Sequence, residues 1–188
     1  GFMFGLSSFI ASFLYAKDIF DYAFQNPLIS ILPRVLFAVA AFFIYKGLKI
    51  LFKKLKNGKL YSFILVTIVS VLFAYFVSQG LHKTTGWELN YIYIIAGLLL
   101  IGILILYYYF LSNKQYNNLT FVPTVFITSS IVHSVLVLSM VALFKPSAYD
   151  GADIFGVILA VLSTNALFEA LIAVLIGSPI VVALYNLT

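Results

Sequence analysis

Asn165 and Glu169 are polar residues inside an otherwise apolar stretch, 153–176, that is long enough to cross a bilayer. They lie four residues apart, so their side chains share one face of an α-helix. An amide or carboxyl group at membrane depth costs a few kcal/mol on insertion scales, which makes it a candidate for ligand binding. Glu169 could equally pair with another helix or extend toward the membrane interface. The sequence leaves these two interpretations open.

The stretch 121–144 carries a second set of polar side chains. At about 100° per residue, four of these side chains fall within one arc of roughly 140°: Ser129, Ser130, His133 and Ser134. An imidazole beside hydroxyl groups can exchange hydrogen bonds with a small polar ligand. A histidine that is satisfied inside a helix bundle is the alternative interpretation. Because two apolar stretches each carry such a polar turn, we favour a binding site.

Arg34 is the third candidate, at the start of another apolar stretch. Pro33 precedes it, and proline suits the first turn of a helix because its missing N–H needs no partner there. We therefore expect the guanidinium of Arg34 at the mouth of a membrane helix. There it could attract an anion or bind a lipid phosphate, and both interpretations stay open.

The composition places these groups in an integral membrane protein. Of 188 residues, 63% are hydrophobic and 9% are charged, and the mean hydropathy is +1.11. A soluble domain carries about 25% charged residues. The sequence has no GxxxxGK[ST] phosphate loop, two histidines and no cysteine. These counts argue against nucleotide hydrolysis by that route and against histidine or thiolate metal centres. We expect neither an enzyme nor a cofactor.

Six stretches approach the roughly 20 apolar residues that a spanning helix needs. They are 1–16, 33–52, 60–78, 91–111, 121–144 and 153–176. The expected fold is all-α, a polytopic helix bundle that forms one multi-pass domain of the cell membrane over residues 1–188. We expect a break at 177–179 after the last helix. Because the first stretch starts in mid-span, further N-terminal helices are expected before Gly1.

Charge predicts the orientation of these helices. Six lysines lie in or beside the connection between the second and third helices, and one more follows the fourth: Lys46, Lys49, Lys53, Lys54, Lys56, Lys59 and Lys114. Five of the six acidic residues fall in the other connections: Asp18, Asp21, Glu88, Asp150 and Asp153. The positive-inside rule then puts the lysine-rich connections and the C-terminus in the cytoplasm. Next to spanning helices, such lysines set topology and attract anionic lipid, so we expect no nucleic-acid partner.

Small residues form a stripe along the first helix, including Gly5 and Ser8. Such a stripe lets another helix approach closely. We favour this packing role over contact with a ligand.

Four stretches resemble the substrate-binding S component of energy-coupling factor (ECF) transporters, the vitamin importers of bacteria. FGLSSF (4–9) resembles the family's third helix and NPLISILPRVL (26–36) its outer loop and fourth helix. IVHSVLVL (131–138) resembles the fifth helix and STNALFEA (163–170) the sixth. The second stretch is the most specific and indicates the branch that binds pantothenate and riboflavin. His133 departs from the family, which often has Asn or Thr there, and residues 60–112 look like an inserted helical hairpin.

The resemblance implies a subunit that binds a vitamin from outside and works with a membrane coupling subunit and two ATPase subunits. Pantothenate, a small anion with hydroxyl groups and an amide, is the favoured substrate. Riboflavin or a pyrimidine precursor is the alternative, and a non-transporting membrane assembly subunit is the alternative from another class. The implied substrate-binding residues are Asn26, Arg34, Ser129, Ser130, His133 and Asn165, while Glu169, Gly5 and Ser8 have coupling or structural roles.

Helical rise sets the expected depth of these groups. Asn165 would lie roughly 18 Å from the start of its helix, near the membrane midplane. In the outward-opening pocket that the resemblance implies, we therefore expect Asn165 at the floor, His133 on the wall and Glu169 below the floor.

Overall fold

The computed structural model describes residues 1–112, 119–149, 151 and 153–185, and within these residues it consists of helices and short connections, without a strand. Lys114 and Asp150, used above for the orientation, lie outside this part. The helices in chain order are α1 (Phe2–Tyr15), α2 (Ile19–Ala23), α3 (Pro27–Ser30), α4 (Leu32–Lys54), α5 (Gly58–Thr85), α6 (Leu89–Ser112), α7 (Val122–Phe144), the 3₁₀ turn η2 (Pro146–Tyr149), α8 (Ile154–Val161), α9 (Leu167–Ile172) and α10 (Ser178–Tyr185).

Five helical spans of the described chain are long and apolar enough to cross a membrane. They are Pro27–Lys54, Gly58–Lys83, Leu89–Tyr109, Val122–Phe144 and Leu167–Tyr185. The first predicted stretch forms α1, which is apolar but only 14 residues long. The predicted all-α membrane helix bundle is confirmed.

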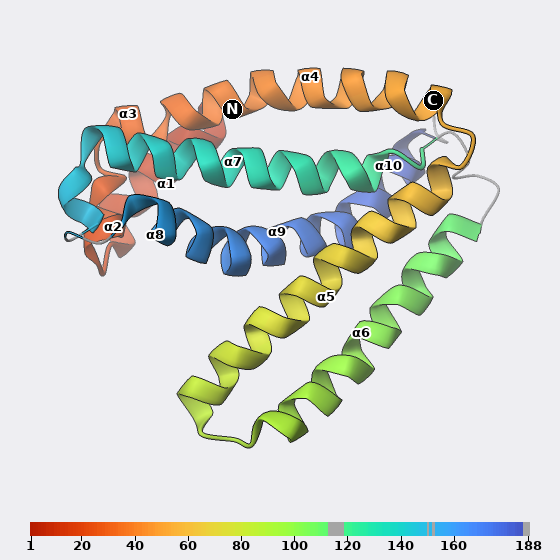
Figure 1. The fold of residues 1–188 in the computed structure, drawn as a ribbon. Coiled ribbons are helices and arrows are strands. Elements are labelled where there is room, and N and C mark those ends of the chain that lie inside the picture. The colour runs from red at the N-terminus through yellow and green to blue at the C-terminus, as the bar shows by residue number, and fades with distance from the viewer. Residues whose placement is uncertain (113–118, 150, 152, 186–188) are drawn as a thin grey trace.

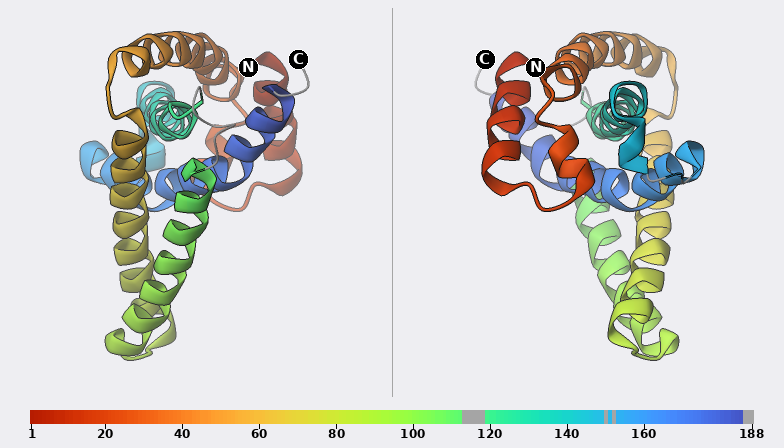
Figure 2. Two further views of the ribbon diagram at one scale, coloured as in Figure 1. Left: turned by 90° about the vertical axis from the view of Figure 1, so that its right-hand side faces the viewer. Right: turned by 90° about the vertical axis from the view of Figure 1, so that its left-hand side faces the viewer.

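Three long rods form the body of the molecule: α4, α7 and the line of α8, α9 and α10, with α7 between the other two (Figure 1). The short helix α1 packs against α3 and α4. An end-on view shows α1 beside the start of α4 (Figure 2). The connection between α4 and α5 and the end of α10 lie at one end of the body, which we call the lysine end. Helices α2 and α3 and the start of α8 lie at the opposite end.

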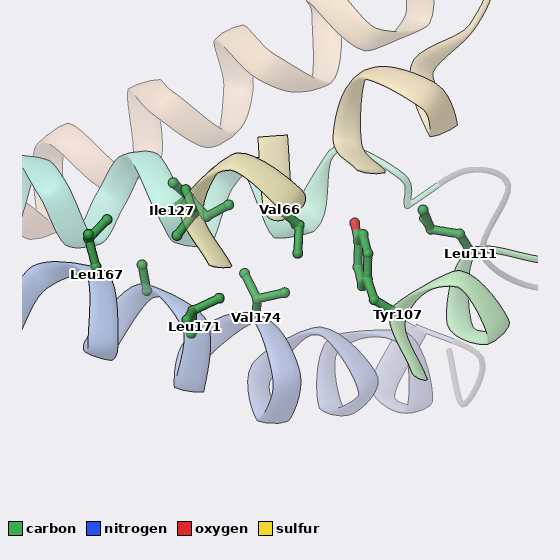
Figure 3. Close-up of a cluster of buried hydrophobic side chains, with 9 residues drawn as sticks. Val66, Tyr107, Leu111, Ile127, Leu167, Leu171 and Val174 are labelled. Carbon is green, nitrogen blue, oxygen red and sulfur yellow. The ribbon is translucent and has the colours of Figure 1, made fainter. Parts of the chain in front are cut away.

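Helices α5 and α6 form a hairpin that slants away from the body (Figure 1). Its base is anchored by apolar side chains of α5, α6, α7 and α9, among them Val66, Tyr107, Ile127 and Leu171 (Figure 3). Within the hairpin, the buried hydroxyl groups of Ser62 and Tyr107 lie 2.6 Å apart and share a hydrogen bond. Beyond this base α6 packs chiefly on α5.

Helix α5 is longer than the sequence predicted, since it continues from 78 to Thr85. The predicted stretch ended at Ser78, but the Ser78 hydroxyl donates to the Ala74 carbonyl (2.7 Å) and leaves the helix intact. The helix ends at Gly86, whose φ of 70° is left-handed and whose N–H caps the His82 carbonyl.

The predicted break at 177–179 is wrong, because the last rod runs from Ile154 to Tyr185 through two π-helical turns. These turns are η3 (Leu162–Ala166) and η4 (Ala173–Gly177). Each π turn inserts an extra residue into the α-helical ladder. Pro179 follows η4, where the ladder is already interrupted, so its missing N–H does not end the helix.

The end opposite the lysines is closed by a small apolar cluster around Ala23, Ile29 and Tyr149. The buried Tyr149 hydroxyl donates to the Leu138 carbonyl at 2.8 Å. Burial raises the pKa of this hydroxyl. The cluster holds α2 and α3 against the end of α7 and so fixes the segment that leads into Arg34.

Candidate functional site

Arg34 is buried in the first turn of α4, with 7% of its surface exposed. Its Nη1 donates to the Ser30 carbonyl at 2.7 Å, and the Ser30 hydroxyl in turn donates to the Phe24 carbonyl. Asn26 supports this arrangement, because its side chain accepts from the Leu28 N–H (3.0 Å) and caps α3. The bend between α2 and α4 therefore turns the guanidinium into the protein rather than toward the surface.

Two aromatic rings flank the guanidinium of Arg34. Its Cζ lies 5.1 Å from the centroid of the Phe4 ring and 5.3 Å from that of Phe24. At these distances the ring faces attract a cation. Arg34 itself is buried, and electrostatic interactions strengthen where water is excluded.

Arg34 Nε is buried and has no hydrogen-bond partner among the described residues. A buried donor without a partner is rare and costs roughly 1–3 kcal/mol, more when it is charged. This N–H is therefore available to an acceptor that the protein itself does not provide.

His133, on α7, contacts the same Phe4 ring as Arg34 and, like Arg34, carries a buried nitrogen. Its ring centroid is 5.5 Å from that of Phe4 and 4.9 Å from that of Phe37. Its Nε2 is also buried without a hydrogen-bond partner in the part of the chain that is described. Phe4 thus contacts both Arg34 and His133, and two unpaired buried nitrogens come from neighbouring helices.

Glu169, on α9, belongs to the same electrostatic group. The charges of Arg34 and Glu169 act on each other, and that of Arg34 also acts on His133. Arg34 and Glu169 both lie in the described part of the chain, and no nitrogen of Arg34 is within 4.0 Å of a carboxylate oxygen of Glu169. The Glu169 side chain is exposed and leaves the guanidinium without an ion pair among the described residues. Helical spacing alone did not predict this link.

Hydroxyl groups extend the site along α7. Ser129 lies one turn before His133, and its buried Oγ has no hydrogen-bond partner among the described residues. Thr124 Oγ1 is also buried without a partner among the described residues, but it lies nine residues before His133, on the opposite face of α7, and is not part of this group. Ser130 is half-buried. The wall of α7 thus offers hydroxyl groups as well as the imidazole.

Asn165 is less closely tied to this group than the sequence predicted. It lies in the π turn η3 and is exposed, and no described hydrogen bond or ring contact joins it to Arg34 or His133. The extra residue of a π turn rotates the side chains before it relative to those after it. The shared α-helical face assumed for Asn165 and Glu169 is therefore altered. π turns are frequent at functional sites, and Asn165 stays a candidate on that ground.

Gly5 is what lets α1 bring Phe4 to Arg34. An ideal Cβ placed on Gly5 would lie 2.7 Å from Ile31 Cα and 3.1 Å from the Ser30 carbonyl oxygen. Ser8, one turn later, is half-buried and lines a shallow groove with Asp21 at the end opposite the lysines. Both small residues thus lie where α1 meets the segment before α4.

Sequence reasoning missed the aromatic residues of the site, which are Phe4, Phe24 and Phe37. The chain has 19 phenylalanines, so residue type gave no reason to single these out. The position of Phe4 beside Gly5 was the one available signal.

Comparison with family models, with curated proteins and with solved structures finds no match to this chain.

Proposed function

We propose that this chain is a membrane-embedded substrate-binding subunit that takes a small organic anion from outside the cell. Of known families, the S component of ECF vitamin importers is the one that its sequence resembles. The observation that carries the proposal is the pair of buried, unpaired nitrogens, Arg34 Nε and His133 Nε2, around the ring of Phe4.

A carboxylate is the ligand that best fits the chemistry of these groups. Guanidinium and carboxylate form short, charge-assisted hydrogen bonds that are often bidentate. A small-molecule pocket usually has a mainly apolar wall that carries a few polar groups. Pantothenate remains the first candidate, because its carboxylate suits Arg34 and its hydroxyl groups and amide suit His133 and Ser129.

Transport would require partners that supply energy. The sequence carries no phosphate loop, so we propose a membrane coupling subunit and two ATPase subunits, as the resemblance implies. Glu169 lies near the middle of the rod that runs from Ile154 to Tyr185. Its contacts with the partner subunits would then change when a bound anion neutralises Arg34. An assembly subunit that binds no small molecule is the competing function.

Equilibrium binding to the detergent-purified protein tests this proposal. Radiolabelled pantothenate, riboflavin and a pyrimidine carboxylate are titrated in parallel. We expect saturable binding of pantothenate at one site per chain. If the protein binds riboflavin and neither of the other two, riboflavin is its substrate. If it binds none of the three, the alternative function as an assembly subunit is favoured.

Replacing His133 with phenylalanine is expected to weaken pantothenate binding roughly 2- to 10-fold, the range of one hydrogen bond between uncharged groups. Phenylalanine keeps a ring against Phe4 and Phe37 but removes both nitrogens. The same change at His82, which lies on the hairpin and bonds to the Trp87 carbonyl, is the matched control and should leave affinity unchanged. Asn165→Ala should weaken binding less than His133→Phe. If His133→Phe and His82→Phe bind pantothenate equally tightly, His133 does not belong to the site.

A further inference from the structure

A second site lies at the lysine end, away from Arg34 and His133. There a groove of about 520 Å³ opens between the end of α4, the start of α7 and the end of α10. Its lining combines two cations, a hydroxyl group and aromatic rings, from Tyr45, Lys49, Phe52, Lys53, Thr120 and Phe121.

Lys49 and Lys53 give the groove its charge. They lie four residues apart, so both ammonium groups are on one face of α4, and both side chains are exposed. Two like charges at this spacing destabilise a helix unless an anion lies between them. Neither lysine forms an ion pair with any described carboxylate. Lys49 Nζ instead lies 5.6 Å from the centroid of the Tyr45 ring.

An adjoining groove increases the positive potential. It is lined by Lys56 and Lys59 and shares Phe52 and Thr120 with the first groove. The stretch 46–59 contains no acidic residue, so nothing in its own sequence neutralises these lysines. Fields from like charges add, and the two grooves therefore attract an anion together.

The level of the groove along the membrane normal indicates which anion it binds. Helix α4 ends at Lys54, so Lys53 lies in its last turn and Lys49 about 7 Å before its end. At roughly 1.5 Å per residue, the 23 residues of α4 cover somewhat more than the roughly 30 Å of a hydrocarbon core. The two ammonium groups therefore lie at the level of the lipid headgroups, and the rings of Tyr45 and Phe52 lie where aromatic side chains meet the membrane interface.

We propose that this groove binds the phosphate of an anionic membrane phospholipid between Lys49 and Lys53. The acyl chains of the lipid remain in the bilayer, and Thr120 supplies a hydroxyl group to the headgroup. The aromatic walls favour a lipid over a free phosphate, because a hydrated anion gains nothing from Phe52 and Phe121. The proposal is independent of the substrate that binds near Arg34.

Lipid titration followed by native mass spectrometry of the detergent-purified protein tests the site. The wild-type protein should retain phosphatidylglycerol and not phosphatidylcholine. Lys49→Gln with Lys53→Gln should lower the affinity for phosphatidylglycerol roughly 100-fold, the effect of losing two charge-assisted hydrogen bonds to one phosphate. Lys49→Arg with Lys53→Arg should stay within about threefold of wild type, because both charges remain.

The matched control removes two other lysines from the same helix. Lys46 and Lys54 are exposed on α4 but do not line the groove, and replacing both with glutamine should change affinity less than about threefold. An equal loss in the two double glutamine variants would mean diffuse attraction and overturn the site. Binding of glycerol phosphate as tight as that of the lipid would overturn the choice of a lipid.

Discussion

Replacing Arg34 with alanine is expected to lower the affinity for pantothenate by at least about 30-fold. Truncating one partner of a buried, hydrogen-bonded charge pair costs roughly 2–5 kcal/mol, and each 1.4 kcal/mol is about tenfold in affinity. Alanine removes the unpaired Nε donor, the bond from Nη1 to Ser30 and the contacts with Phe4 and Phe24. Arg34→Lys should retain part of the affinity, because an ammonium keeps the charge but not the planar pair of donors.

The control for Arg34 is another cation at the same end of the bundle. Lys17 is exposed after the end of α1, and Lys17→Ala removes one positive charge without touching the site. Its affinity for pantothenate should stay within about twofold of wild type, since exposed charges are screened by salt. Thermal unfolding of each variant in detergent separates lost binding from lost folding. Wild-type affinity in a folded Arg34→Ala protein would exclude Arg34 from the site.

Gly5→Ala is expected to destabilise the protein by about 1–3 kcal/mol, the usual cost of forcing extra volume into a packed interior. The added methyl group would lie 2.7 Å from Ile31 Cα and 3.1 Å from the Ser30 carbonyl oxygen, and neither backbone atom can rotate away. Helix α1 must then move outward and take Phe4 with it. Pantothenate binding should therefore fall together with stability.

Gly47→Ala is the matched control for Gly5. Gly47 lies inside α4, and nothing is within 4 Å of a Cβ placed there. Alanine should leave stability unchanged or raise it by up to about 1 kcal/mol, because alanine is the better helix former. The free energy of unfolding in mixed detergent micelles measures both variants. Equal effects of the two substitutions would mean that α1 does not pack closely against the segment before α4.

The helices could be predicted from the sequence because a bilayer leaves few alternatives. A long apolar stretch must satisfy its backbone hydrogen bonds internally, so composition and length were sufficient for four of the five long spans. The fifth span is Leu167–Tyr185, whereas the sequence predicted 153–176. Helix ends were predicted less well. The sequence placed an end at Ser78, but a polar side chain that bonds to its own helix does not end it, whereas the left-handed Gly86 does.

The π turns could not be predicted, because they depend on how the last rod packs against α5 and α7 rather than on residue type. They carried the helix through Pro179 and altered the position of Asn165 relative to Glu169.

The polar members of the candidate site were visible in the sequence, since Arg34, Ser129 and His133 are unusual in apolar stretches. Their grouping was not, because it depends on contacts between α1, α4 and α7. The ring of Phe4 joins Arg34 to His133, and it does so only because α1 approaches closely at Gly5. Asn26 was singled out as a ligand, but its side chain caps α3 and acts on the site by positioning Arg34.

The central claim is that Arg34 recognises the negative charge of a small ligand. Its most direct test compares pantothenate with pantothenol, in which an alcohol replaces the carboxylate, on the wild-type protein and on Arg34→Ala. We predict that the wild-type protein binds pantothenate at least about 30-fold more tightly than pantothenol, and that Arg34→Ala removes this difference. Equal affinity of the wild-type protein for the two compounds would contradict the claim, as would a preference for pantothenate that persists in Arg34→Ala.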